Sequence, residues 1–333
     1  MRGVDLERFR FDYDLTFAVL LMHPDGHVYH RYGGRDWRRA DRWLGMESFE
    51  RVLRATLDEH AAYGARPDAD RDPPPRREPR AIEDVPAFAK RDKGECIHCH
   101  SVFPALYEDG VARGTWDAKD VWIHPPPARL GIDLDAIEQE LVVSVEPGSP
   151  ADAAGLAVGD RLARVGEQRV LTVSDLAWTL ERHPSAGGPL RVAYRRGDEE
   201  RETELALAPG WKAGTPLEFS WRPFKWGLVP AMGFGGAELT AERKAALGLA
   251  AGAFAFEVGY LVTWGDNRRF GQAAARAGVR DGDVVVAVGG KRDFRSVDHV
   301  HAWWRLTREP GDEVEVELLR GGERVVVRVP VVE

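Results

Sequence analysis

The residues best suited to chemistry are two cysteines in the motif Gly94-Glu95-Cys96-Ile97-His98-Cys99-His100. Two thiols at this spacing lie on one helical turn and can form thioether bonds to both vinyl groups of a haem. The imidazole of His100 would then lie below the iron as its proximal ligand. The motif therefore predicts haem c, with His100 as the iron ligand.

Two other uses of the same atoms stay open. A dithiol–disulfide pair needs only Cys96 and Cys99, with His98 lowering the pKa of one thiol. A zinc ion could instead take both cysteines together with one or both of His98 and His100. Because the chain has only 2 cysteines, a framework of several disulfides is excluded.

The overall composition limits the class of protein that carries this motif. The chain has 333 residues, which is enough for two or three domains. Its net charge of -8 argues against nucleic-acid binding by bulk electrostatics. The longest nearly unbroken apolar stretch, 247–256, is too short to cross a bilayer, so we expect no transmembrane segment.

The N-terminal residues 1–65 have the pattern of a β-hairpin followed by a helix. An apolar run at 16–22, the turn residues 24–26 and a second strand from Val28 predict the hairpin. Apolar residues at helical spacing over 49–57 predict the helix. Such a unit is too small to bury a core alone, so it either packs on later segments or lacks its other half. We expect the second, that the other half is missing from this chain.

Two short segments follow this unit. Residues 66–80 are almost entirely proline and charged residues, which predicts a semi-rigid linker. Residues 81–127 carry the cysteine motif, and a helix is expected from Ser101 to Leu106. The cysteines are therefore expected to lie at the start of a short helix.

The remainder of the chain contains an internal duplication. Residues 154–166 align without a gap with residues 277–289. This predicts two copies of one domain, at 128–211 and 222–333, because a repeat this long is typical of whole domains. Each copy is expected to have strands around a short helix and a longer one, with extra residues at 259–270 in the second copy.

The first copy carries a specific sequence signature. It has S-P-A-x-x-A-G-L-x-x-G-D-x-[LIV] at 149–162 and a V-x-D-L helix from Val173. This pattern resembles PDZ domains of the bacterial, HtrA-like type. None of the serines stands in a G-x-S-x-G nucleophile turn, so we expect no protease activity in this chain.

The resemblance implies that each copy binds protein C-termini or extended peptides. A glycine-containing loop would accept the peptide carboxylate, and the next strand would pair with the peptide main chain. The alternative is that the same residues belong to the core of a domain that binds no ligand. The residues implied in binding are Arg129, Leu130, Gly131, Ile132 and Leu176 in the first copy, and Lys225, Trp226, Gly227, Leu228 and Val300 in the second.

The N-terminal unit resembles the C-terminal half of a thioredoxin fold. Residues 16–26 match a stretch that in this family follows a cis-proline, where this chain has Leu15. With the C-x-x-C-H segment and the two PDZ-like copies, the order of segments resembles the thioredoxin-fold/PDZ family, some members of which are selenoproteins. The resemblance implies that the redox-active N-terminal half is absent, and that Met1 is an internal start after a selenocysteine codon read as stop.

We therefore expect a multidomain α/β and β-rich protein with a partial thioredoxin-like unit, a short helical C-x-x-C-H segment and two PDZ-type domains. Its expected function is extracytoplasmic peptide binding next to a redox module, with no catalytic activity expected in this chain alone. The alternative is a thiol-disulfide oxidoreductase whose PDZ-type domains select substrates. The expected location is periplasmic or extracytoplasmic if a signal precedes Met1, and cytoplasmic if Met1 is the true start.

Overall fold

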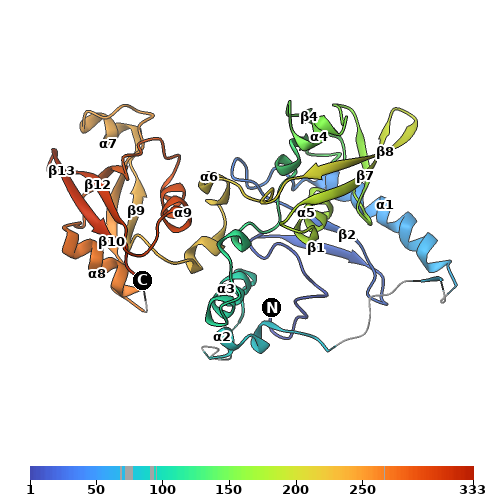
Figure 1. Cartoon of the computed structure of the whole chain (residues 1–333), viewed down its shortest axis with the longest axis horizontal. Helices are drawn as coiled ribbons and strands as arrows, with labels where there is room; N and C mark the ends of the chain where they lie inside the picture. Colours follow the sequence, from blue (N-terminus) through green and yellow to red (C-terminus); the bar gives the residue numbers. More distant parts are fainter. Residues whose placement is uncertain (68–69, 72–77, 91–93, 95, 266) are drawn as a thin grey trace. The chain divides into compact units, whose positions relative to one another are not determined.

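The computed structural model describes residues 1–333 except 68–69, 72–77, 91–93, 95 and 266. The chain forms two compact units, Met1–Gly214 and Thr215–Glu333. The predicted mixed α/β, β-rich architecture is confirmed (Figure 1). No helix in the described part of the chain is both long and apolar enough to cross a membrane.

The first unit begins with the predicted hairpin and helix. The antiparallel strands β1 (Ala18–Met22) and β2 (Val28–Gly33) are joined by a turn that the His23 N–H closes on the carbonyl of His27 at 2.8 Å. Helix α1 (Met46–Gly64) follows and contacts β2. The hairpin forms a two-stranded sheet of its own, so its thioredoxin-like interpretation stays a prediction.

Residues 81–127 are built from short helices. The predicted helix after the cysteine motif is confirmed as α3. Part of the expected linker 66–80, and Glu95 of the motif, lie outside the described residues. The helical elements here are η2 (Ile82–Asp84), α2 (Pro86–Ala89), η3 (Cys99–Ser101), α3 (Val102–Ala112) and η4 (Ala118–Val121).

The first copy contains two small antiparallel sheets, β3-β4 and β6-β5-β7-β8, with two helices. Its long helix α5 starts where the sequence predicts, because the Thr172 side chain accepts a hydrogen bond from the Asp175 N–H. The elements are η5 (Pro127–Leu130), β3 (Ile132–Leu134), β4 (Val142–Val145), α4 (Pro150–Ala153), β5 (Arg161–Val165), β6 (Gln168–Arg169), α5 (Val173–Arg182), β7 (Gly188–Arg196) and β8 (Glu199–Leu207).

The second unit has one antiparallel sheet in the order β13-β12-β11-β10-β9. Its core is rich in aromatic side chains, among them the fully buried Trp304. The elements are α6 (Pro216–Phe219), η6 (Pro223–Gly227), β9 (Phe234–Glu238), α7 (Ala241–Ala246), β10 (Phe256–Leu261), α8 (Arg268–Ala277), β11 (Val284–Val288), α9 (Val297–Thr307), β12 (Glu313–Arg320) and β13 (Glu323–Pro330).

One ion pair repeats in both copies. The buried Asp160 accepts two hydrogen bonds from the Arg196 guanidinium, at 2.7 and 2.8 Å. Asp283 and Arg320 make the same two bonds at 2.7 and 2.8 Å. Each pair ties the G-D turn before a central strand to the end of a strand in the closing hairpin. The same ion pair therefore lies at matching positions of the two predicted copies.

The expected position of the insertion in the second copy was only partly right. Within this stretch, residues 259–261 form the end of β10 and residues 268–270 form the start of a longer helix α8. A second and larger insertion lies between β9 and β10, where residues 239–255 include α7 and the first copy has only residues 135–141. Comparison of the two copies in sequence missed this insertion, because the aligned stretches 154–166 and 277–289 begin only after β4 and β10.

The repeated ion pair leads to a stability prediction. Arg320→Met should lower the free energy of opening of β12 by about 2 kcal/mol, because it leaves the carboxylate of Asp283 buried without its partner. Arg324→Met is the matched control, since Arg324 makes an exposed ion pair with Glu317 at 3.3 Å and should change this value by less than about 0.5 kcal/mol. Hydrogen–deuterium exchange of β12 peptides measures both, and equal effects would contradict the prediction.

Candidate functional site

A left-handed glycine ends the loop before β3. Gly131 has a φ of +80°, and a Cβ on this residue would lie 2.0 Å from the Cβ of Ser149. Only glycine fits both the backbone conformation and this close approach. The loop conformation is thus set by one residue that the sequence had indicated.

Strand β3 has one edge that faces away from its partner β4. The Glu146 N–H donates to the Gly131 carbonyl at 2.7 Å on the β4 side. Because main-chain groups alternate along a strand, those of Ile132 and Leu134 point to the opposite edge. An edge of this kind is where an extended peptide can add as a further strand.

The structure brings together the predicted apolar residues of the first copy. Leu130, Ile132 and, from α5, Leu176 are buried in the same apolar cluster. Arg129 is partly buried, and its Nε donates to the Lys212 carbonyl at 3.3 Å. These three side chains would also be buried if they belonged only to the core of a domain that binds no ligand. Their peptide-binding role therefore stays a prediction.

The loop expected in the second copy lies elsewhere. Lys225, Trp226 and Gly227 belong to the short helix η6, and the next residue, Leu228, is buried. The counterpart of Gly131 is instead Gly233, which has a φ of +84° and directly precedes β9. We therefore correct the position of this loop.

The contacts of Gly233 support this assignment. Its carbonyl accepts from the Val262 N–H at 2.8 Å, as that of Gly131 does from Glu146. A Cβ on Gly233 would lie 2.2 Å from the carbonyl carbon of Phe270. The order apolar–Gly–apolar in Met232-Gly233-Phe234, directly before a strand, is the sequence signal that could have found it.

The residues expected as the second loop pack on helix α9 instead. The Lys225 ammonium lies 3.2 Å from the Asp298 carboxylate, and the Trp226 ring centroid lies 4.7 Å from that of His301. Val300 is fully buried in the core. Burial, with the positive charges of Arg305 and Lys225, holds the pKa of His301 well below its usual value, so this imidazole is neutral.

The cysteine motif lies directly before α3, with Cys99 and His100 in the short helix η3. Cys96 is exposed, whereas Cys99 is partly buried and its Sγ lies 3.8 Å from the Leu15 carbonyl. Burial raises the pKa of the Cys99 thiol, which works against a reactive thiolate. No group of three or more metal-binding side chains occurs among the residues described. Haem, dithiol and zinc at Cys96, Cys99, His98 and His100 all stay predictions.

Comparison with known proteins adds to this geometry. A family model described as "PDZ domain" matches residues 128–207. Residues 128–207 form a PDZ domain. A curated relative, "Putative serine protease HhoB" of Synechocystis sp., is 40% identical over 70 residues, which is 21% of this chain and 16% of that protein. The chain therefore matches only a small part of that relative.

Two solved structures show the same kind of likeness. A crystal structure of the HtrA3 PDZ domain bound to a phage-derived ligand (FGRWV) is 26% identical, with 20% of this chain and 60% of that chain covered and a TM-score of 0.18. The HtrA-type protease AlgW with a decapeptide is 14% identical, with 52% and 54% covered and a TM-score of 0.24.

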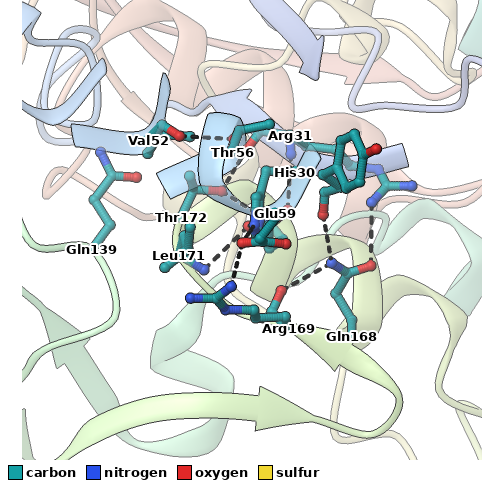
Figure 2. A network of polar contacts seen from close by, with 12 residues as sticks. His30, Arg31, Val52, Thr56, Glu59, Gln139, Gln168, Arg169, Leu171 and Thr172 are labelled. Carbon is teal, nitrogen blue, oxygen red and sulfur yellow. Dashed lines mark hydrogen bonds and ion pairs between the residues drawn. The ribbon is translucent and has the colours of Figure 1, made fainter. Parts of the chain in front are cut away.

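The N-terminal hairpin is hydrogen-bonded to helix α5 of the PDZ domain. The buried His30 lies between two carboxylates, with Nδ1 2.8 Å from Asp175 and Nε2 2.8 Å from Glu59. Figure 2 shows Glu59 between His30 and Arg169, with which it forms an ion pair. No local sequence pattern indicates this cluster, because its members lie far apart along the chain.

The charge of His30 follows from these contacts. Burial alone would lower the pKa of His30, but hydrogen bonds to Asp175 and Glu59 outweigh it and raise this pKa to about 9. Burial lowers the pKa of the neighbouring Arg31 to about 10. At neutral pH the cluster therefore holds a protonated imidazole between two carboxylates.

The raised pKa of His30 predicts how stability depends on pH. A pKa above the unfolded value of 6.5 means that this contribution is fully present below pH 6.5 and is lost as the pH rises through about 9. The Glu59→Gln variant should lose the stabilising contribution of His30 at a lower pH, because one of the two carboxylates that bind the imidazole is gone. NMR titration of His30 and urea unfolding at several pH values measure this, and titration near pH 6.5 in the unaltered chain would contradict it.

Proposed function

We propose that this chain is a peptide-binding protein whose PDZ domain takes protein C-termini or extended peptides. The proposal is carried by the Gly131 loop, which directly precedes an edge strand in a domain matched to the PDZ family. The N–H groups of the loop would donate hydrogen bonds to the peptide carboxylate, and the outer edge of β3 would pair with the peptide main chain. Arg129 would add a positive charge near the carboxylate.

Side-chain selectivity would come from the apolar residues around the loop. Leu130, Ile132 and Leu176 lie together, so a terminal apolar side chain of the peptide is the type that fits. Because these three are buried without ligand, binding requires a local shift of neighbouring side chains. A free carboxylate and a terminal apolar residue are thus the two features of the proposed ligand.

The second copy offers a similar arrangement. Gly233 precedes the edge strand β9 as Gly131 precedes β3, and we extend the proposal to this edge. The expected residues Lys225, Trp226 and Val300 would act there through α9, since the first two contact that helix and the third belongs to it. An extracytoplasmic location and selection of substrates for a redox partner remain part of the proposal.

Peptide binding can be tested at Gly131. The Gly131→Ala variant should abolish binding of the pentapeptide FGRWV, the ligand named for the HtrA3 PDZ domain, because the added Cβ collides with Ser149. Amide chemical-shift changes in the labelled full chain measure binding up to millimolar affinity. Gly148→Ala is the control, because Gly148 also has a positive φ of +77° but nothing within 4 Å of its Cβ position.

The outcomes of this test are distinct. Binding by the unaltered chain and by Gly148→Ala, together with loss in Gly131→Ala, supports the proposal. Equal binding by all three chains places the ligand elsewhere. An unaltered chain whose amide signals do not move at millimolar peptide contradicts the proposal for this ligand.

A second candidate function is haem c binding at the cysteine motif. His100 Nε2 is buried and has no hydrogen-bond partner within the described structure, which fits an axial ligand. Cys96, exposed at the surface, and Cys99 would attach the group. When bound, haem would supply one-electron redox chemistry.

This candidate has a direct test. After expression with a c-type cytochrome maturation system, we expect a pyridine-haemochrome spectrum that Cys96→Ser together with Cys99→Ser abolishes. His98→Gln should keep the spectrum, because His98 is exposed and is not needed as a ligand. A colourless product from the unaltered chain would reject haem and leave the dithiol and zinc alternatives.

A further inference from the structure

The chain's own segment between β2 and α1 reaches the outer edge of β3. The Arg42 guanidinium donates to both carboxylate oxygens of Asp133 on this strand, at 2.7 and 2.8 Å. The same nitrogen donates to the main-chain carbonyl of Leu134 at 3.3 Å. An N-terminal side chain thus bonds a main-chain group of the edge that a peptide would use.

Both outward main-chain groups of Leu134 have partners within the chain. Its carbonyl accepts a hydrogen bond from the Arg42 guanidinium, and its N–H donates to the Asp133 carboxylate at 3.0 Å. A peptide strand that paired with β3 would need these same two groups. The main-chain groups of Leu134, at the end of β3 far from Gly131, are therefore already hydrogen-bonded within the chain. Ile132 lies at the other end of the strand, next to Gly131.

Trp43 fills the apolar space beside this edge. Its side chain is only 4% exposed and belongs to the same apolar cluster as Ile132, Leu134 and Val173. Gln139 holds it in place, because its Nε2 donates to the Trp43 carbonyl at 3.0 Å and its Oε1 accepts from the Val173 N–H at 3.1 Å. Trp43 thus lies between β3 and the start of α5.

We propose that Arg42 and Trp43 act as an internal ligand of the PDZ domain, which an external peptide must displace to pair with the whole edge of β3. The inference rests on the proposed peptide-binding function and names how that site is regulated. The segment is anchored by the Ser174 hydroxyl, which donates to the Gly33 carbonyl at 2.7 Å. This anchor keeps the local concentration of the internal ligand high.

The contacts made by Arg42 are of a kind that a peptide can replace. Arg42 binds β3 through its side chain and not as a paired strand, and both Arg42 and Asp133 are partly exposed, at 18% and 37%. Displacement therefore breaks an ion pair and one hydrogen bond while the β3–β4 pairing stays intact. Trp43 must also leave its site, which is the larger cost.

The segment itself supplies a matched control. Trp37 and Arg38 are a neighbouring tryptophan and arginine, but Trp37 is 38% exposed. The Arg38 guanidinium lies 5.3 Å from the centroid of this ring. A change at this pair removes the same residue types from the same segment without opening β3.

The test compares the affinity of FGRWV for four full-length chains. Arg42→Gln and Trp43→Ala should each bind the peptide at least about tenfold more tightly than the unaltered chain, because the apparent affinity rises with the fraction of open sites. The control that combines Trp37→Ala with Arg38→Ala should bind as the unaltered chain does. Arg42→Gln keeps Trp43 in the core, so the peptide affinity of this variant tests the proposal even if Trp43→Ala fails to fold.

Each outcome has one meaning. Tighter binding by Arg42→Gln, with chemical-shift changes at Leu134 and Val173, supports the internal ligand. Equal affinity of all four chains overturns it while the proposed peptide-binding function stands. If no chain binds the peptide, the proposed function fails and the internal ligand fails with it.

Discussion

The buried carboxylate of Asp175 fixes how the N-terminal hairpin lies on the PDZ domain. It accepts from the Arg31 N–H at 2.8 Å and the Leu171 N–H at 3.2 Å, and it pairs with His30. A charge this deeply buried is stable only when its oxygens are fully bonded. Strand β2 must therefore stay at the start of α5, and the segment that carries Trp43 is placed at the edge of β3 as a result.

The two copies share their turns but differ at their edges. The ion pairs Asp160–Arg196 and Asp283–Arg320 have the same bonds, because the G-D turn must be tied to the closing hairpin in both. Strand β9 instead contains Gly235, where a Cβ would lie 2.4 Å from the Tyr260 hydroxyl. The two copies therefore share this ion pair but differ at the edge strand.

Local signals predicted the hairpin, the glycine turns and the capped helix α5, because each depends on residues that are neighbours in sequence. The Gly131 loop was found for the same reason. The second loop was misplaced because Gly227 and Gly233 both follow an apolar residue, and only the start of β9 distinguishes them. The burial of Trp43 and the His30 cluster could not be predicted, since both join residues about a hundred positions apart.

A cation followed by tryptophan contacts each copy, Arg42-Trp43 the first and Lys225-Trp226 the second. The Arg42 guanidinium lies 4.4 Å from the Trp43 ring centroid, and the Lys225 ammonium lies 4.7 Å from that of Trp226. Arg42 pairs with Asp133 on β3, and Lys225 pairs with Asp298 on α9. Trp43 is 4% exposed and Trp226 is 45% exposed. Because the hydrophobic contribution scales with buried area, the contact made by Trp43 is more strongly stabilised than the contact made by Trp226.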